Sequence, residues 1–239
     1  MDVRPGRDFV KRIMSSLSLR PIATLRTPFA EKFGVPRQSG LVPEAEGTIE
    51  FLPEFSAPEF LRGLEAFSHL WIITAFHQNP AWTGSAVVRP PRLGGNETVG
   101  VFASRSPNRP NPLGLSVLRI LDHAPGRIRV AGVDAVDGTP VFDVKPYLPW
   151  AESFPDARSD WAPQPPSMSG DERVLIDAAA RARLGEGTTR LVQRLLQLQL
   201  QPAYQAGDDR TYGMTVSGWN VRWRTLPDGR VEVVEIQRV

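Results

Sequence analysis

Three apolar runs, Leu-Ser-Val-Leu-Arg-Ile-Leu (115–121), Arg-Ile-Arg-Val-Ala-Gly-Val-Asp-Ala (127–135) and Val-Phe-Asp-Val-Lys (141–145), decide the fold of this chain. Each is short enough for a single strand and contains β-branched residues. Turn signals separate them, Pro125-Gly126 after the first run and Asp137-Gly138 after the second. Short strands joined by such turns, with no long helix between them, favour a β-barrel or β-sandwich over a doubly wound sheet.

The sequence before these runs continues the pattern of short strands. Strands are predicted at 19–27, 48–52, 69–77 and 99–103, and the apolar run 69–77 is typical of a buried strand. A brief helix is also predicted, because Ser56 and Glu59 have capping-box spacing and Pro58 suits a first helical turn. This helix would run toward Phe67.

The second part of the chain has a different composition. Residues 149–170 are rich in Pro, Ser, Asp and Ala, which indicates a linker or an extended arm. Ser169-Gly170-Asp171-Glu172 resembles a capping box that opens a helix to about Leu184. A second helix is predicted at 189–198, followed by strands at 212–216, 221–225 and 230–236. The fold is therefore expected to be mainly β, with a β domain of about 140 residues followed by a smaller α+β domain.

Composition excludes several kinds of site. The 239 residues include no cysteine, which excludes disulfides, thiolate catalysis and cysteine-ligated metals. His69, His77 and His123 lack a familiar zinc spacing, so we expect no metal site. No apolar run has the length of a membrane helix and no signal-peptide core is present, so we expect a cytoplasmic protein with no membrane partner. The net charge is only +2, but residues 1–40 hold eight Lys/Arg against three acids, as a polyanion partner would require.

An arginine-rich loop spans residues 88–116. Arg89, Arg92, Arg105 and Arg109 lie there among many Pro and Gly residues, which restrict its shape and let the backbone approach a ligand. Guanidinium groups on such a loop suit phosphate or carboxylate recognition, because each presents a rigid fork of donors. The alternative is a solvated loop whose arginines bind nothing.

Polar clusters at the expected strand ends form a candidate ligand site. They are Pro36-Arg37-Gln38, His77-Gln78 and Asp137-Gly138-Thr139-Pro140, followed by Asp143, Lys145 and Tyr147 on the next strand. Together they offer an amide, an imidazole, a guanidinium and free turn N–H groups to a polar ligand. Each also has a structural alternative: His77 as a satisfied strand-end histidine, Asp137-Gly138 as a plain turn, and Asp143 with Lys145 as a surface ion pair.

Near the C-terminus, Trp219-Asn220-Val221-Arg222-Trp223-Arg224 interleaves aromatic and basic side chains. Base stacking combined with phosphate contacts requires that mixture. An amphipathic core strand explains it equally well, since Val221 and Trp223 fall on the same face. No dinucleotide-binding glycine motif, phosphate-loop lysine motif or nucleophile elbow is present, so those enzyme classes have no support.

Taken together, these segments resemble the TsaA-like family of tRNA N6-threonylcarbamoyladenosine methyltransferases, the TrmO family. The matching segments are PRQSGLV (36–42), RGLEAFSHLWI (62–72), FHQ (76–78), VRPPRLGGN (88–96), GVFASRSPNRPNPLG (100–114), DGTPV (137–141), DVKPYLP (143–149) and NVRWR (220–224). The resemblance is dense up to residue 156 and sparse from 157 to 200. It implies an N-terminal extension (1–18), a TsaA-like β-barrel domain that binds S-adenosylmethionine (19–160) and a C-terminal α+β domain that contacts tRNA (161–239).

The implied activity is S-adenosylmethionine-dependent N6-methylation of the threonylcarbamoyl adenosine beside the anticodon of a threonine tRNA, performed by a homodimer. By carry-over, the residues around the cofactor would be Pro36, Arg37, Gln38, His77, Gln78, Arg105, Leu115, Asp137, Gly138, Thr139 and Pro140. RNA contacts are expected from Arg89, Arg92, Arg109, Lys145, Arg222 and Arg224.

Methyl transfer needs no covalent nucleophile, which agrees with the missing cysteine and hydrolase motifs. The acceptor N6 must lose a proton, and Asp143, Tyr147 and His77 are the candidates for the general base, unranked by sequence. Two alternatives stay open. One is a non-catalytic RNA-binding module whose arginines hold phosphates, and the other is a methyltransferase that acts on a protein or a small metabolite.

Overall fold

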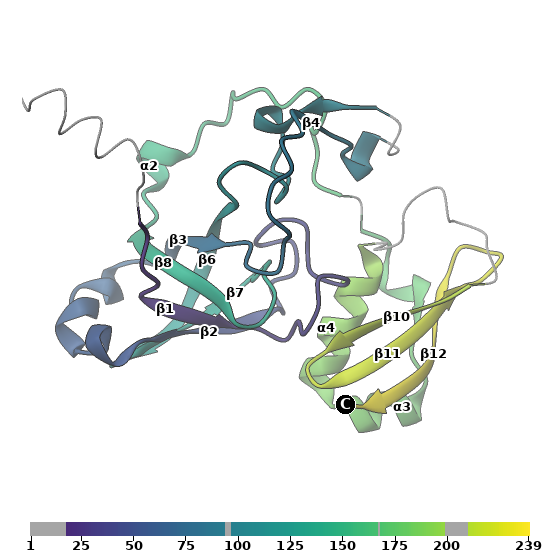
Figure 1. The fold of residues 1–239 in the computed structure, drawn as a ribbon. Coiled ribbons are helices and arrows are strands. Elements are labelled where there is room, and N and C mark those ends of the chain that lie inside the picture. The colour runs from purple at the N-terminus through teal and green to yellow at the C-terminus, as the bar shows by residue number, and fades with distance from the viewer. Residues whose placement is uncertain (1–17, 94–96, 167, 199–209) are drawn as a thin grey trace, which may run out of the picture.

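The computed structural model describes residues 18–93, 97–166, 168–198 and 210–239, so the 1–18 extension lies outside the described residues except for residue 18. Six antiparallel strands close a barrel in the order β1-β2-β7-β6-β3-β8 (Figure 1). The strands are β1 (Ala23–Arg26), β2 (Glu46–Phe51), β3 (His69–Ala75), β6 (Leu113–Ala124), β7 (Arg127–Ala131) and β8 (Thr139–Pro146). The predicted mainly β fold with an N-terminal barrel is therefore confirmed.

Alternation along the strands builds the barrel interior. In β3 every second residue, Leu70, Ile72 and Thr74, is buried, because successive side chains of a strand point to opposite faces. The fully buried apolar side chains contributed by the barrel strands include Leu25, Ile49, Leu70, Ile72, Leu118 and Ile128. Each such side chain contributes about 1.5–3 kcal/mol relative to an exposed one.

The helix predicted over 56–67 is wrong. This stretch contains separate 3-10 helices at Pro58–Leu61 and Leu64–Ala66, preceded by another at Pro53–Phe55. Gly63 has a φ of 90°, a left-handed conformation that interrupts a continuous α-helix. Ser56 caps no helix, because its hydroxyl donates to the Leu52 carbonyl at 2.9 Å instead.

Only the beginning of the predicted strand 99–103 forms. There β5 (Val99–Gly100) pairs with β4 (Val87–Val88) in a small separate ribbon, and Val101–Ala103 becomes a 3-10 helix. A further 3-10 helix spans Pro91–Leu93. The described parts of the arginine-rich loop therefore comprise this two-strand ribbon, the two 3-10 helices and an irregular return to β6 (Figure 1).

The C-terminal part is a four-stranded sheet in the order β10-β11-β12-β9, with two helices packed beside it (Figure 1). Its elements are β9 (Val174–Leu175), α3 (Ala178–Leu184), α4 (Glu186–Gln197), β10 (Thr211–Val216), β11 (Trp219–Thr225) and β12 (Val231–Arg238). Among the described residues, no helix is long and apolar enough to cross a bilayer.

The first of these helices begins later than the sequence predicts. Asp171–Arg173 forms a 3-10 helix and β9 follows it, so the capping box predicted at 169–172 opens no α-helix. The N-cap of α3 is Asp177, whose Oδ1 accepts a hydrogen bond from the Ala180 amide at 2.6 Å. Val174 pairs with Val231 and is buried, and this packing against the sheet outweighs the local capping signal.

The barrel and the C-terminal sheet share one hydrophobic core. Phe29 forms a β-bridge with Val216, and the carboxylate of Glu31 accepts a hydrogen bond from the Thr215 amide at 2.9 Å. Arg194 of α4 forms an ion pair with Glu44 at 3.1 Å. The C-terminal sheet therefore holds the barrel segment that leads from β1 to the Pro36–Gln38 cluster.

Candidate active site

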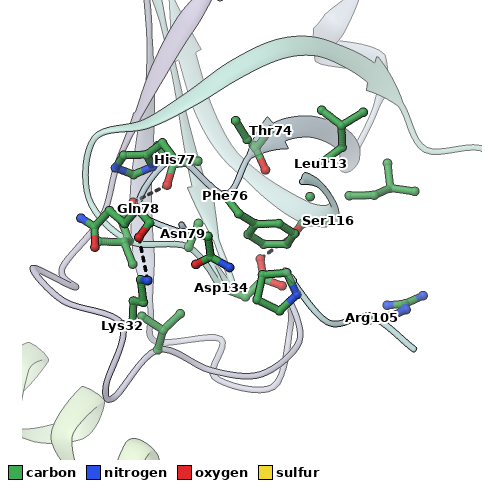
Figure 2. A pocket seen from close by; sticks show the side chains of 18 of the residues that line it. Lys32, Thr74, Phe76, His77, Gln78, Asn79, Arg105, Leu113, Ser116 and Asp134 are labelled. Carbon is green, nitrogen blue, oxygen red and sulfur yellow. Dashed lines mark hydrogen bonds between the residues drawn. The ribbon is translucent and has the colours of Figure 1, made fainter. Parts of the chain in front are cut away.

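A pocket of about 500 Å³ opens at one end of the barrel (Figure 2). Three loop segments surround it, 32–38, 76–79 and 104–109, together with the adjacent strand ends. The volume is within the roughly 300–1,000 Å³ that small-molecule and cofactor sites occupy.

The inner wall of the pocket is polar. Thr74 of β3, Ser116 of β6 and Thr139 of β8 are buried and line it, although the same faces of these strands are apolar farther along the barrel. Gly114 pairs with Thr74, and a Cβ at Gly114 would lie only 2.4 Å from the Thr74 hydroxyl oxygen. A glycine is therefore required for β6 to pass this close to Thr74.

Asp134 lies on the same wall and was not predicted from the sequence. Its Oδ1 accepts a hydrogen bond from the Ser116 hydroxyl at 2.7 Å, and Figure 2 shows this pair inside the pocket with Arg105 at its edge. Burial raises the pKa of Asp134, against the opposing effects of the Ser116 hydrogen bond, two backbone amides and the charge of Arg105. No strand pattern points to it, because β7 ends at Ala131 and Gly132, with a φ of 81°, breaks the alternation before Asp134.

The pocket brings together most of the residues expected to bind the cofactor. Arg105 donates a hydrogen bond to the Gln38 side chain, and Lys32 donates one to the Gln78 carbonyl at 2.7 Å. These contacts join the three loops at the mouth of the pocket. The expected residues that line it are Pro36, Arg37, Gln38, His77, Gln78, Arg105, Leu115 and Thr139.

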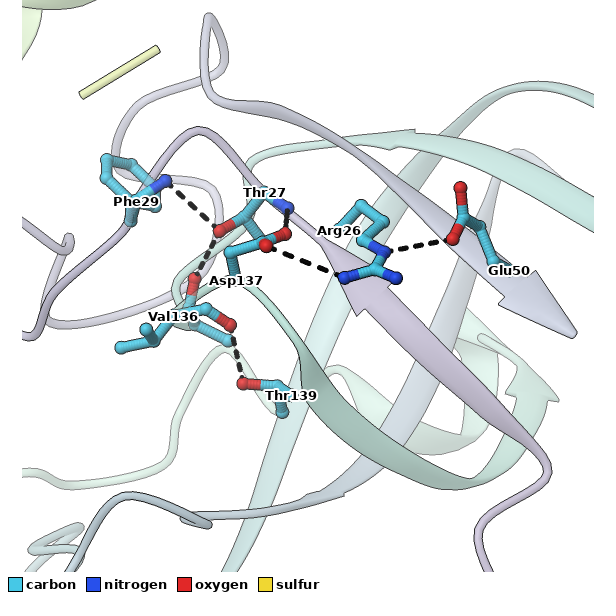
Figure 3. Close-up of polar contacts among 8 residues, drawn as sticks. Arg26, Thr27, Phe29, Glu50, Val136, Asp137 and Thr139 are labelled. Carbon is cyan, nitrogen blue, oxygen red and sulfur yellow. Dashed lines mark hydrogen bonds and ion pairs between the residues drawn. The ribbon is translucent and has the colours of Figure 1, made fainter. Parts of the chain in front are cut away.

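Asp137, Gly138 and Pro140 do not line the pocket. The Asp137 carboxylate accepts a hydrogen bond from the Thr27 amide at 2.9 Å and lies 3.6 Å from the Arg26 guanidinium (Figure 3). Gly138 has a φ of 77° and donates from its amide to the Leu25 carbonyl at 3.0 Å. In this structure the turn ties β8 to β1, and Thr139 alone of the four residues reaches the pocket wall.

The three candidates for the general base lie in different places. His77 is exposed and lines the pocket. Asp143 pairs with Ile73 on the outer face of the barrel, where Lys145 forms an ion pair with it at 2.9 Å. The Tyr147 ring packs against His69 and Trp71, outside the pocket lining.

The residues expected to bind RNA also separate into groups. Arg109 lines the pocket and Arg89 is exposed beside the β4–β5 ribbon, whereas the side chain of Arg92 lies outside the described part of the structure. Arg222 and Arg224 form ion pairs with Glu235 and Glu232, at 2.9 Å and 2.7 Å. Three of the expected cations, Lys145, Arg222 and Arg224, are thus paired with carboxylates.

The sequence did not predict a further basic cluster, in which Arg183 and Arg238 lie over the ring of Trp219. The guanidinium groups of Arg183 and Arg238 lie 5.5 Å and 5.1 Å from the centre of the Trp219 ring. Arg183 is on α3, far from β12 in sequence, so no local pattern brings the two arginines together. Within the described ranges, neither arginine has a carboxylate within ion-pair distance.

The described residues hold no group of three or more His, Asp or Glu side chains that could bind a metal ion. The segment 143–156, called the arm below, contains helix α2 (Pro149–Glu152) and is attached to its own barrel, because Glu152 accepts a hydrogen bond from the Trp71 indole at 2.7 Å. Trp150 and Phe154 nevertheless remain 84% and 70% exposed.

Comparison with known proteins gives consistent matches along the chain. Two family models match it, the tRNA-methyltransferase O N-terminal domain over residues 24–153 and the TrmO C-terminal domain over residues 171–239. An Escherichia coli (strain K12) protein named tRNA (adenine(37)-N6)-methyltransferase is 41% identical over 226 residues, which cover 90% of this chain and 96% of that protein. A Pseudomonas aeruginosa relative, whose name describes an S-adenosylmethionine-dependent methyltransferase, is 40% identical over 224 residues, 92% of this chain and 97% of that protein.

Solved structures agree with these matches. A crystal structure of TrmO from Pseudomonas aeruginosa has a TM-score of 0.77 at 33% identity, and the match covers 94% of this chain and 98% of that one. Another crystal structure of TrmO has a TM-score of 0.75 at 35% identity, with 92% and 99% covered. The likeness extends over both the barrel and the C-terminal sheet.

Proposed function

The chain belongs to the tRNA-methyltransferase O family, and from this premise we propose that it methylates N6 of adenosine 37 in tRNA with S-adenosylmethionine as the methyl donor. The observation that carries the proposal is the pocket at the end of the barrel. It brings together three clusters that are far apart in sequence, Pro36–Gln38, His77–Gln78 and Arg105, and these are segments that resemble the family. A non-catalytic RNA-binding module would not need such a pocket.

The pocket fits a donor that carries a carboxylate, an ammonium group and an adenosine. Arg105 and Arg37 supply guanidinium groups suited to a carboxylate, and the side-chain amide oxygen of Gln78 is a neutral acceptor suited to an ammonium group. Leu115 and Phe76 supply apolar surface for a heterocycle. When bound, S-adenosylmethionine supplies an activated methyl group on a sulfonium.

Positioning is the main contribution expected from the protein. Holding two reactants in line can supply about 7–11 kcal/mol of the barrier at best, without a covalent intermediate. The pocket is built for this, because the Arg105–Gln38 and Lys32–Gln78 contacts hold three loops against one another. The burial of Thr74 and Ser116 keeps the inner wall away from bulk water.

We propose further that the accepted adenosine carries the N6-threonylcarbamoyl group, in a threonine tRNA. A threonyl carboxylate needs a cationic site near N6, and Arg37, Arg105 and Arg109 all line the pocket. Phosphates of the tRNA would contact Arg89 and Arg92 on the loop 88–116, together with the C-terminal sheet. Since tRNA is modified where it is used, we propose that the protein acts in the cytoplasm.

We propose that the protein works as a homodimer through the arm 143–156. Exposed aromatic anchors are typical of interfaces, and Trp150 and Phe154 are the most exposed aromatic side chains of this arm. The arm would pack near the arginine-rich loop of a second copy of this chain. The Trp71–Glu152 hydrogen bond holds the backbone of the arm on its own barrel and leaves these aromatic rings free.

A direct test combines two measurements. Calorimetry should detect binding of S-adenosylmethionine to the purified protein, and tRNA from cells lacking the gene should accept a labelled methyl group that nucleoside mass spectrometry places on N6 of adenosine 37. Binding of tRNA without methylation would favour the RNA-binding module. Methylation of a protein or a small metabolite, but not of tRNA, would favour another substrate.

A further inference from the structure

Asp134 differs from every other residue of the pocket in its charge. Among the described residues that line the pocket it is the one carboxylic acid, and the charged or titratable groups around it are Lys32, Arg37, His77, Arg105 and Arg109. It is half-buried and lies beside Ser116, whose hydroxyl donates a hydrogen bond to it. A carboxylate that is half-buried on such a wall loses part of its hydration, so its presence points to a task there.

Its surroundings suit proton transfer. A general base is most effective when its pKa lies near the working pH, and an ordinary aspartate is too acidic for that. Burial raises the pKa of Asp134 toward that range, while the Ser116 hydrogen bond and the Arg105 charge limit the rise. The Ser116 hydroxyl also fixes the orientation of the carboxylate through Oδ1.

We propose that Asp134 is the general base that removes the N6 proton of the acceptor adenosine, with Ser116 as its positioning residue; this rests on the proposed methyltransferase function. In the transfer, the N6–H bond breaks and its proton moves to a carboxylate oxygen of Asp134. The electron pair on N6 forms the bond to the methyl carbon. The electron pair of the broken sulfur–carbon bond stays on sulfur, which becomes a neutral thioether.

The other candidates are less well placed for this step. Asp143 lies on the outer face of the barrel in an ion pair with Lys145, and Tyr147 packs against His69 and Trp71 outside the pocket. His77 does line the pocket but is exposed at its mouth, where solvent competes for its ring nitrogens. Asp134 combines a half-buried position with a hydrogen bond that orients it.

The first experiment measures methylation and cofactor binding in Asp134→Asn, with Asp122→Asn as the matched control. Asp122 is on the outside of β6, paired with Arg129 at 2.6 Å and away from the pocket. Loss of a general base should lower kcat by about 10²–10⁴-fold, while the dissociation constant of S-adenosylmethionine changes by less than about threefold. Asp122→Asn should keep wild-type kcat.

The second experiment uses Ser116→Ala and has a readout independent of activity. The carboxyl ¹³C NMR signal of Asp134, assigned by its absence in Asp134→Asn, should titrate at a higher pH in Ser116→Ala than in the wild type. Since the base acts deprotonated, the acidic limb of kcat against pH should move to higher pH in the same direction. Ser56→Ala, outside the pocket, should shift neither curve.

Several results would overturn the assignment. An Asp134→Asn variant with near-wild-type kcat would do so, as would one that loses cofactor affinity but keeps kcat at saturation, since Asp134 would then bind the donor. If Asp134→Asn fails to fold, an unchanged pH profile in Ser116→Ala decides against the proposal. A wild-type protein that methylates no tRNA would instead refute the proposed function, which separates the two failures.

Discussion

The rings of Phe33 and Trp223 stack across the boundary between the barrel and the C-terminal sheet, with centroids 5.9 Å apart and planes 7° apart. Trp223 is buried in β11, whereas Phe33 sits in the loop that continues into Pro36–Gln38. Lys32, its neighbour, lines the pocket and donates a hydrogen bond to Gln78. The C-terminal sheet therefore supports one side of the cofactor pocket without lining it.

Phe33→Ala should weaken cofactor binding although Phe33 does not line the pocket. An aromatic pair is worth about 0.5–1.5 kcal/mol beyond area burial, and its loss would free the loop that presents Lys32 and Gln38. We expect a dissociation constant for S-adenosylmethionine raised by about two- to tenfold, measured by calorimetry. Phe60→Ala removes a 60% exposed ring far from the pocket loops and should leave the constant unchanged. Equal affinity in both variants would show that the stack supports only the domain junction.

Gly114→Ala should close the inner wall of the pocket. The new Cβ would meet the Thr74 hydroxyl oxygen at 2.4 Å, well inside contact distance, so Thr74 or β6 must shift. Cofactor binding should therefore be lost or strongly reduced. Adding Thr74→Ala removes the clashing oxygen and should restore binding, because the remaining neighbour, the Phe76 ring, is at an ordinary 3.4 Å. Gly100→Ala, with nothing within 4 Å, serves as the control.

Asp134→Asn should raise the melting temperature at pH 7 and leave it almost unchanged at pH 3. Because burial raises the pKa of Asp134 in the folded state, the folded protein holds this proton more tightly than the unfolded chain. The stabilisation that this group provides is fully present below its pKa in the unfolded chain. It is lost as the pH rises through its pKa in the folded protein. The side-chain amide of asparagine does not ionise, so the variant does not lose this stabilisation at pH 7. A variant less stable than the wild type at pH 7 would indicate that the carboxylate has a structural role.

Sequence patterns predicted short strands joined by turns, in a barrel or a sandwich, and the resemblance to the TrmO family implied the barrel. The polar clusters at strand ends predicted that Pro36–Gln38 and His77 belong to one site, and the resemblance added Arg105; all of them line the pocket. They did not identify Asp134, since a lone aspartate before a turn is ordinarily exposed, and Gly132, with a φ of 81°, ends the strand alternation before Asp134. Asp143 shows the reverse case. Asp143 follows soon after Thr139, which lines the pocket, but its pairing with Ile73 turns its side chain to the outside of the barrel.

Arginines without carboxylate partners should dominate tRNA binding. In a plot of log affinity against log salt concentration, each phosphate contact makes the slope more negative by about 0.9 for a duplex, because binding releases counterions. Arg238→Ala should therefore flatten the slope, because Arg238 contacts Trp219 with no carboxylate partner among the described residues. Arg222→Ala should flatten it less, since Glu235 already neutralises Arg222 at 2.9 Å. Fluorescence titrations at several salt concentrations measure both; an equal slope for Arg238→Ala and wild type would exclude this cluster from the RNA surface.

Trp150→Glu should convert the proposed dimer into monomers with much reduced methylation. Trp150 is 84% exposed, so a glutamate there costs the isolated barrel little, whereas a charge at the centre of an apolar interface is left without a partner. The Trp71–Glu152 hydrogen bond would still hold the arm on its own barrel, so circular dichroism should match the wild type. Phe60→Glu changes a 60% exposed aromatic residue of the barrel domain, outside the arm and the pocket, and is the matched control. Light scattering and a methylation assay on the same samples decide the question, because a fully active monomer would mean that each chain carries a complete site.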